Sequence, residues 1–139
     1  HIGKKCETYS YSNMMYQEAI MSDSQTCAIC ISYSGVSNEL IETAKLLKNN
    51  DVPIIAITSI GENDLSKISN VKLSLTTREK SYTKIAGFST IESISLVLDI
   101  LYSCYFASNF DNHFAYKTKV AESTEKRKKT NIIIDEISD

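Results

Sequence analysis

A group of hydroxyl side chains follows a short apolar run in the first third of the chain. Residues 27–31 are all apolar, and Ser32, Ser34, Gly35 and Ser37 come directly after them. An apolar run of this kind is typical of a strand that is buried on both faces. Ser37 stands immediately before an amphipathic pattern, where a helix N-cap is preferred. The stretch therefore predicts a strand, a serine-rich turn and the start of a helix.

This turn has the donor groups that a phosphate needs. The first backbone N–H groups of a helix have no partner within the helix, and the positive end of the helix dipole favours an anion. Ser32, Ser34 and Ser37 add neutral hydroxyl donors, and Gly35 lets the backbone approach a ligand closely. Such a site requires no metal, cofactor or charged side chain, and we predict none. The alternative is an ordinary strand-to-helix turn with a good cap.

A second pair of hydroxyls follows the next predicted strand. Pro53 opens the apolar run 54–57, and Thr58 and Ser59 come after it. In a parallel sheet the carboxyl ends of the strands share one edge, which is where open α/β sheets bind ligands. We therefore expect Thr58 and Ser59 to lie at the same edge as the serine turn.

The chain resembles the SIS (sugar isomerase) domain over roughly residues 2–128. The resemblance depends on Ser-Tyr-Ser-Gly-Val-Ser-Asn-Glu at 32–39, Ala-Ile-Thr-Ser at 56–59 and Leu-Asp-Ile-Leu-Tyr at 98–102. More narrowly, these motifs are similar to those of the effector domain in the RpiR family of bacterial transcriptional regulators. The resemblance implies a phosphosugar ligand whose phosphate is held by the first turn. The residues implied as ligand-binding are Ser32, Tyr33 through its backbone, Ser34, Gly35, Ser37, Thr58 and Ser59.

The sequence also departs from the family pattern. Val36 stands where an acidic residue is usual, Ser37 replaces a threonine, and Asn13 stands where many relatives carry histidine. The first strand of the family and its Gly-x-Gly-x-Ser loop do not occur before His1. In a flavodoxin-like strand order 2-1-3-4-5 the missing strand would be central. We expect either that the sequence is a piece of a longer protein or that a partner fills the gap.

Composition limits the possible classes of protein. The 139 residues suit one domain, with 42% hydrophobic and 23% charged residues. A net charge of −2 argues against direct binding of nucleic acid, so DNA would be bound only through a helix-turn-helix domain that this chain lacks. The longest apolar runs, about five residues, are too short to span a bilayer, so we expect no membrane partner.

The four cysteines predict reduced, mostly buried thiols in a cytoplasmic protein. Cys27 and Cys30 lie three positions apart on a predicted strand, which sends them to opposite faces and excludes a shared metal. Cys6 and Cys104 have no ligand-like neighbours in the sequence.

Strand and helix patterns alternate along the chain and predict an α/β fold. We expect a three-layer α/β/α domain over residues 1–129, with a doubly wound parallel sheet, and a tail over 130–139. The predicted strands are 4–9, 26–32, 54–57 and 71–75. The predicted helices cover 13–22, the run from Ser37 to about Asn49, a short segment ending near Ile68, 88–109 and 113–129. The polar stretch 76–83 is expected to be a mobile loop that covers the ligand.

The helix over 88–109 is apolar on more than one side, which fits either a dimer interface or a buried core helix. Three functions remain open: a ligand sensor, an aldose–ketose sugar-phosphate isomerase and a purely structural dimerisation domain. An isomerase needs an acid and a base, and the candidates Glu39, Glu92 and His113 form no convincing pair. The sequence therefore favours a non-enzymatic sensor that acts as a homodimer or higher homo-oligomer.

Overall fold

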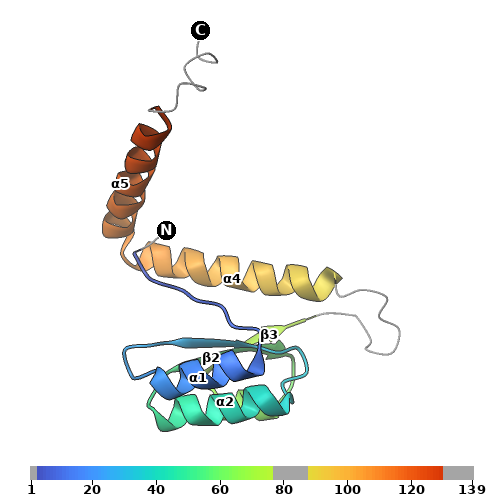
Figure 1. Cartoon of the computed structure of the whole chain (residues 1–139). Helices are drawn as coiled ribbons and strands as arrows, with labels where there is room; N and C mark the ends of the chain where they lie inside the picture. The colour runs from blue at the N-terminus through green and yellow to red at the C-terminus, as the bar shows by residue number, and fades with distance from the viewer. Residues whose placement is uncertain (1–2, 77–87, 130–139) are drawn as a thin grey trace. The chain divides into compact units, whose positions relative to one another are not determined.

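The computed structural model describes residues 3–76 and 88–129, with side chains described for 3–76 and 89–125. Figure 1 shows the alternation of helices and strands along the chain. The elements are α1 (Ser12–Met21), β1 (Ala28–Ile31), α2 (Asn38–Asn49), β2 (Ile54–Ser59), α3 (Asp64–Ile68), β3 (Val71–Leu75), α4 (Phe88–Ser108) and α5 (Phe110–Lys129). Contacts divide the chain into two compact units, Thr8–Leu98 and the combination of His1–Glu7 with Asp99–Asp139.

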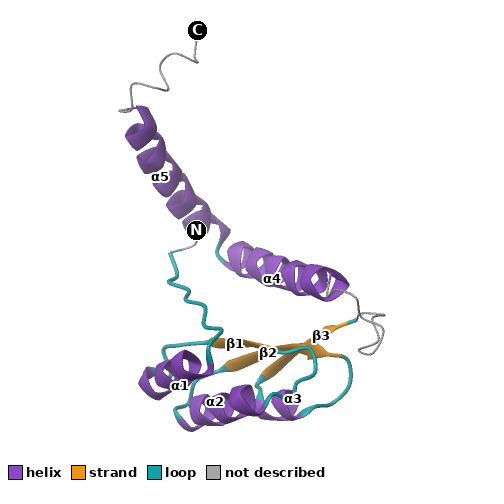
Figure 2. Cartoon of the chain, turned by 45° about the vertical axis from the view of Figure 1, so that its right-hand side comes forward, coloured by secondary structure: helices purple, strands orange, loops and turns teal. Residues whose placement is uncertain are grey.

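The three strands form a parallel sheet in the order β1-β2-β3. Cys30 pairs with Ala56, and Ile57 pairs with Leu73. Helices α1, α2 and α3 lie on one face of this sheet (Figure 2). Parallel neighbours need crossover connections, and α2 and α3 supply them. The predicted α/β fold with a parallel sheet flanked by helices is confirmed.

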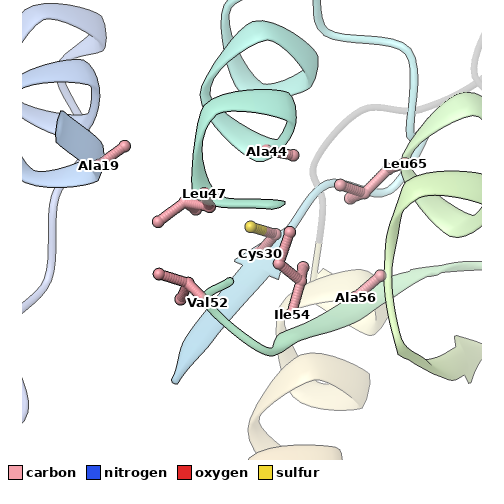
Figure 3. Close-up of a cluster of buried hydrophobic side chains, with 8 residues drawn as sticks. All are labelled: Ala19, Cys30, Ala44, Leu47, Val52, Ile54, Ala56 and Leu65. Atoms are coloured by element: carbon pink, nitrogen blue, oxygen red, sulfur yellow. The ribbon is translucent and has the colours of Figure 1, made fainter. Parts of the chain in front are cut away.

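The core lies between the helices and this face of the sheet (Figure 3). Small and branched side chains from α1, α2, β1, β2, the loop before β2 and α3 meet there. The cluster consists of Ala19, Cys30, Ala44, Leu47, Val52, Ile54, Ala56 and Leu65. Ala44, Ala56 and Leu65 are 0% exposed. The small side chains at 44 and 56 allow α2 to pack closely against the sheet.

The expectation that the 27–31 strand is buried on both faces is wrong. Cys30 is buried, whereas Ile29 and Ile31 are 42% and 41% exposed. These two isoleucines point to the face opposite the helices, and β1 is the outer strand of the described sheet. By contrast, Ile57 in the middle strand β2 is 0% exposed. Position in the sheet decides the burial of a run that looks the same in sequence.

Several element boundaries differ from the sequence prediction. Residues 4–9 form no strand, because the described chain places no neighbouring strand beside them to share hydrogen bonds. Strand β2 extends through Ser59, and α5 begins at Phe110 instead of residue 113. The expected cover loop lies outside the described residues except for Thr76, and the 130–139 tail lies wholly outside them.

Burial of the cysteines also differs from the prediction. All four thiols are free, as expected, but Cys6, Cys27 and Cys104 are exposed and Cys30 alone is buried. Cys6 lies in a segment without regular structure, and Cys104 lies on a face of α4 that is exposed, so neither enters a core.

Aromatic rings and His113 hold α4 and α5 together where the two helices meet. The His113 ring stacks on Tyr105 with centroids 5.0 Å apart, and Phe106 meets Phe110 edge to face at 5.6 Å. His113 Nδ1 lies 3.0 Å from the Phe106 carbonyl oxygen, which can only accept, so this nitrogen carries the proton. His113, a candidate acid or base in the sequence, therefore serves the joint between two helices.

Helix α4 is the one helix in the described ranges that is long and apolar enough to cross a membrane, over Ser89–Ser108, by length and composition alone. Serines, Thr90 and the acidic residues Glu92 and Asp99 interrupt its apolar runs, which is why the runs counted in the sequence are short. A single helix of this kind is weak evidence for a membrane span, because apolar helices of water-soluble proteins meet the same test.

Candidate functional site

The serine turn continues the parallel pairing of β1 and β2 beyond the end of β1. The Ser32 N–H donates to the Ile57 carbonyl at 3.0 Å, and the Ser59 N–H donates to the Tyr33 carbonyl at 3.0 Å. The turn therefore lies at the carboxyl edge of the sheet, directly beside the end of β2. The sequence predicts that the serine turn and the pair Thr58 and Ser59 lie at the same edge of the sheet, and this prediction is confirmed.

Inside the turn the backbone bends sharply around Gly35. This residue is buried and has φ of +66°, a left-handed conformation that glycine adopts without a Cβ penalty. Its N–H donates to Ser32 Oγ at 3.2 Å, so this amide is used within the protein. Ser34, on the other side of the bend, is exposed.

Ser37 is the N-cap of α2, as predicted, but its hydroxyl does not cap the helix. Ser37 Oγ instead donates to Glu39 Oε2 at 3.1 Å. The first helical bond runs from the Ile41 N–H to the Ser37 carbonyl at 2.9 Å. Within the described part of the chain, no acceptor meets the N–H groups of residues 38–40. The predicted anion-binding donors are therefore present and unused by the protein.

Thr58 and Ser59 lie beside the backbone of Tyr33. Thr58 is 0% exposed, and its hydroxyl donates to the Tyr33 carbonyl at 3.2 Å while accepting from Asn63 Nδ2 at 2.9 Å. The single proton of this hydroxyl is thus engaged within the protein. Ser59 is half-buried at the end of β2. The structure brings all seven predicted site residues together, and ligand contact by each stays a prediction.

Asn63 is a residue of this site that the sequence analysis missed. Its side chain accepts from the Ser66 N–H at 3.0 Å, and Ser66 Oγ accepts from the Asn63 N–H at 2.9 Å, forming a capping box at the start of α3. The Leu65 N–H in the same segment donates to the Gly35 carbonyl at 3.0 Å. The Asn-x-x-Ser spacing signals the helix cap, but no sequence pattern signals the contact with the serine turn.

A hollow of about 340 Å³ lies between α1 and α2, next to the first residues of α2. Its lining residues are Ser12, Asn13, Tyr16, Asn38, Glu39, Glu42 and Thr43. The lining offers hydroxyl, amide and carboxylate groups to polar substituents of a ligand. Asn13, at which the sequence departs from the family pattern, lies in this lining.

The chain segment that contains the serine turn carries no positively charged side chain. Residues 6–44 contain no Lys or Arg, so this segment offers an anion backbone N–H groups, hydroxyls and the dipole of α2, but no cationic side chain. Burial raises the pKa of the Cys30 thiol, two residues before the turn, to about 11, and the charge of Cys27 adds to the rise. Cys30 is therefore a neutral thiol near pH 7. No group of three potential metal ligands occurs among the described residues.

With this geometry the chain is an α/β domain with a polar site at the edge of its sheet, and comparison with known proteins assigns its family. The family model of the SIS domain matches residues 1–104, so the chain belongs to the SIS domain family. The resemblance predicted from the serine turn is confirmed. Two of the relatives named below are HTH-type transcriptional regulators, which is consistent with an RpiR-type domain.

Two similar proteins are uncharacterised HTH-type transcriptional regulators. One, from Caldanaerobacter subterraneus subsp. tengcongensis, is 25% identical over 91% of this chain and 44% of its own length. The other, from Clostridium perfringens, is 31% identical over 79% of this chain and 39% of its own length. The chain thus spans less than half the length of these relatives.

A solved structure and an enzyme are also similar. The structure of the Vibrio vulnificus NanR protein complexed with ManNAc-6P matches with a TM-score of 0.74 and 25% identity, covering 99% of this chain and 48% of that one. Arabinose 5-phosphate isomerase KdsD of Francisella tularensis is 47% identical over 47 residues, which are 34% of this chain and 14% of the enzyme.

Proposed function

We propose that this chain is the phosphosugar-binding effector domain of an RpiR-type transcriptional regulator. The observation that carries the proposal is the set of unused N–H groups at residues 38–40, beside the hydroxyls of Ser34 and Ser37. The match to regulators and to NanR complexed with ManNAc-6P supports it.

The ligand is a sugar phosphate whose phosphate sits on the N-terminus of α2. A phosphate monoester carries close to two negative charges near pH 7, so it gains from the helix dipole and from several donors at once. Ser32, Ser34, Ser37 and Ser59 and the backbone of Tyr33 and Gly35 surround it. Thr58 contributes by holding the turn, because its proton is already donated to Tyr33. The sugar extends toward the hollow between α1 and α2.

The regulator acts as a cytoplasmic homodimer or higher homo-oligomer and binds DNA through a helix-turn-helix segment elsewhere in the longer protein. The names of the relatives and the partial length that this chain spans support this assignment. A ligand can control DNA binding only if it has different affinity for two arrangements of the dimer.

Thermal unfolding with and without ligand tests the proposal. We expect ManNAc-6P and other hexose 6-phosphates to raise the melting temperature, since a ligand at 100 times its Kd stabilises by about 2.7 kcal/mol. Ser34→Ala should remove most of this shift, and Ser24→Ala, an exposed serine in another loop, should leave it unchanged. Equal stabilisation by the unphosphorylated sugars would reject a phosphate site.

The second candidate is a sugar-phosphate isomerase. The short, 47% identical match to arabinose 5-phosphate isomerase favours it, and of the two carboxylates that line the hollow, Glu39 is the candidate base because it lies nearer the start of α2. Isomerisation moves a proton between neighbouring carbons, so it needs such a base beside the sugar. Incubation with aldose and ketose phosphates decides between the two: interconversion that is lost in Glu39→Gln would replace the sensor with an enzyme.

A further inference from the structure

The side chain of Asn63 links three parts of the site edge. Its Nδ2 donates to Thr58 Oγ1 at 2.9 Å, and its oxygen accepts from the Ser66 N–H at 3.0 Å. The carboxamide also lies directly over Gly35, because a Cβ built on Gly35 would stand 2.1 Å from Asn63 Oδ1. Capping of a five-residue helix explains the bond to Ser66 but neither the bond to Thr58 nor the contact with Gly35.

The direction of these hydrogen bonds determines how the serine turn is held. Asn63 Nδ2 can only donate, so Thr58 Oγ1 accepts from it and has its own proton free for the Tyr33 carbonyl. The same carbonyl accepts from the Ser59 N–H at 3.0 Å. In the next part of the turn, the Gly35 carbonyl is held by the Leu65 N–H, two residues after Asn63.

A trans peptide unit points its C=O and its N–H in opposite directions. Because the Tyr33 and Gly35 carbonyls are both held against β2 and α3, the N–H groups of Ser34 and Val36 are directed away from these elements. No cis peptide bond occurs in the described residues. The hydrogen bonds to the Tyr33 and Gly35 carbonyls therefore set the orientation of the N–H groups of Ser34 and Val36.

We propose that Asn63 is a positioning residue for the anion-binding turn, acting through Thr58 and through its contact with Gly35 to fix the peptide units 33–34 and 35–36. The inference rests on the proposed function for the identity of the ligand, whereas its effect on the turn is measurable without ligand. Asn63 does not touch the phosphate; it keeps the donors in the orientation that the phosphate requires.

Two substitutions separate this role from simple capping. Asn63→Ser keeps a hydroxyl that can cap the Ser66 N–H but is too short to reach Thr58. Ser66→Ala removes the reciprocal half of the capping box and leaves the Asn63–Thr58 bond intact. Amide hydrogen exchange over residues 32–37 of the full chain, without ligand, and calorimetric titration with ManNAc-6P are the two measurements.

We expect Asn63→Ser to speed exchange in the turn and to weaken ManNAc-6P binding, each by roughly tenfold, the factor that corresponds to one lost hydrogen bond. Ser66→Ala should lower thermal stability yet change both readouts by less than about twofold. Because Asn63 acts partly through Thr58, the double variant Asn63→Ser/Thr58→Val should lose less affinity than the product of the two single-variant losses.

The outcomes separate this proposal from the proposed function. Unchanged exchange of the turn in Asn63→Ser overturns the positioning role, whatever the wild-type protein binds. Faster exchange in Asn63→Ser, in a chain that binds neither ManNAc-6P nor inorganic phosphate, supports the positioning role and rejects the phosphosugar function. Equal effects of Asn63→Ser and Ser66→Ala on the turn would reduce Asn63 to a helix cap.

Discussion

At the residue scale, Gly35 is the most constrained position of the site. Its left-handed φ costs any other residue strain, and an added Cβ would collide with the Asn63 carboxamide. We expect Gly35→Ala to lower the free energy of unfolding by about 3 kcal/mol, from strain plus overpacking. Gly61→Ala is the control, because Gly61 has φ of +97° with open space around it and should lose only about 1 kcal/mol. If urea unfolding gave the same loss of free energy of unfolding for Gly35→Ala and Gly61→Ala, the collision with Asn63 would be contradicted.

Glu39 opposes binding of the proposed ligand in two ways, because it engages the Ser37 hydroxyl and because its charge repels a phosphate. Its carboxylate accepts a hydrogen bond from the Ser37 hydroxyl, with the two oxygens 3.1 Å apart, and a bound phosphate would compete for that hydrogen bond beside a like charge. We expect Glu39→Gln to tighten ManNAc-6P binding by about two- to tenfold, the range for a partly screened charge near the surface. Because Glu39→Gln removes a negative charge from the first turn of α2, the helix should become less stable by about 0.5 kcal/mol.

Glu42→Gln is the matched control for this effect, since it makes the same change in net charge one turn further along α2. Its carboxylate pairs with Lys45 at 2.8 Å and lies in the same hollow. Tightening of the same size in both variants would show that total charge matters, and not the competition for Ser37. Titration at low and at high salt would then give the same pattern for both.

The residues of the turn were predictable because local chemistry marks them. Hydroxyls and a glycine between an apolar run and a helix start suffice to predict a site at Ser32–Ser37. Asn63 and the role of Thr58 were not predictable, because the contacts that tie them to the serine turn join positions 25 or more residues apart, as between Thr58 and Tyr33 and between Asn63 and Gly35. Only the register of β1 and β2 brings these groups together.

At the element scale, strand existence could be predicted and strand burial could not. Strand β3 has the predicted bounds, and β2 was extended by two residues. The apolar runs of β1 and β2 look alike in sequence, yet Ile31 is 41% exposed and its partner Ile57 is 0% exposed. Burial depends on which elements cover each face, which no local window contains. The predicted 4–9 strand fails for the same reason.

Helix α3 shows how tertiary contacts sustain a short element. Five residues are too few for a helix to be stable in isolation, since nucleation is costly. The capping box at Asn63 and Ser66, the fully buried Leu65 and the bond from Leu65 to Gly35 compensate. The helix and the serine turn therefore stabilise one another, and loss of either is expected to loosen both.

At the scale of the whole molecule, α4 presents an apolar surface that the described chain leaves uncovered. Leu96 and Ile100, one turn apart on the same side of the helix, are 60% and 54% exposed, and Glu92 and Asp99 are the only charged residues in the helix. A second copy of the chain presents the same surface, so a symmetric dimer would cover both at once. A surface without Lys or Arg does not suit nucleic acid.

We expect Leu96→Glu to convert a dimer of the 139-residue chain into a monomer, because each interface would bury two carboxylates against apolar neighbours. Light scattering coupled to size-exclusion chromatography measures the mass directly. Ser95→Glu is the matched control: it adds the same charge at the adjacent, exposed position, which lies about 100° around the helix, and should leave the dimer intact.

Wild-type protein that is monomeric at micromolar concentration would contradict the interface, as would wild-type protein that sediments with lipid vesicles and is released by Leu96→Glu. Vesicle binding of this kind would mean that α4 contacts a lipid bilayer, and a sugar phosphate bound at the serine turn could then not act by changing the arrangement of a dimer.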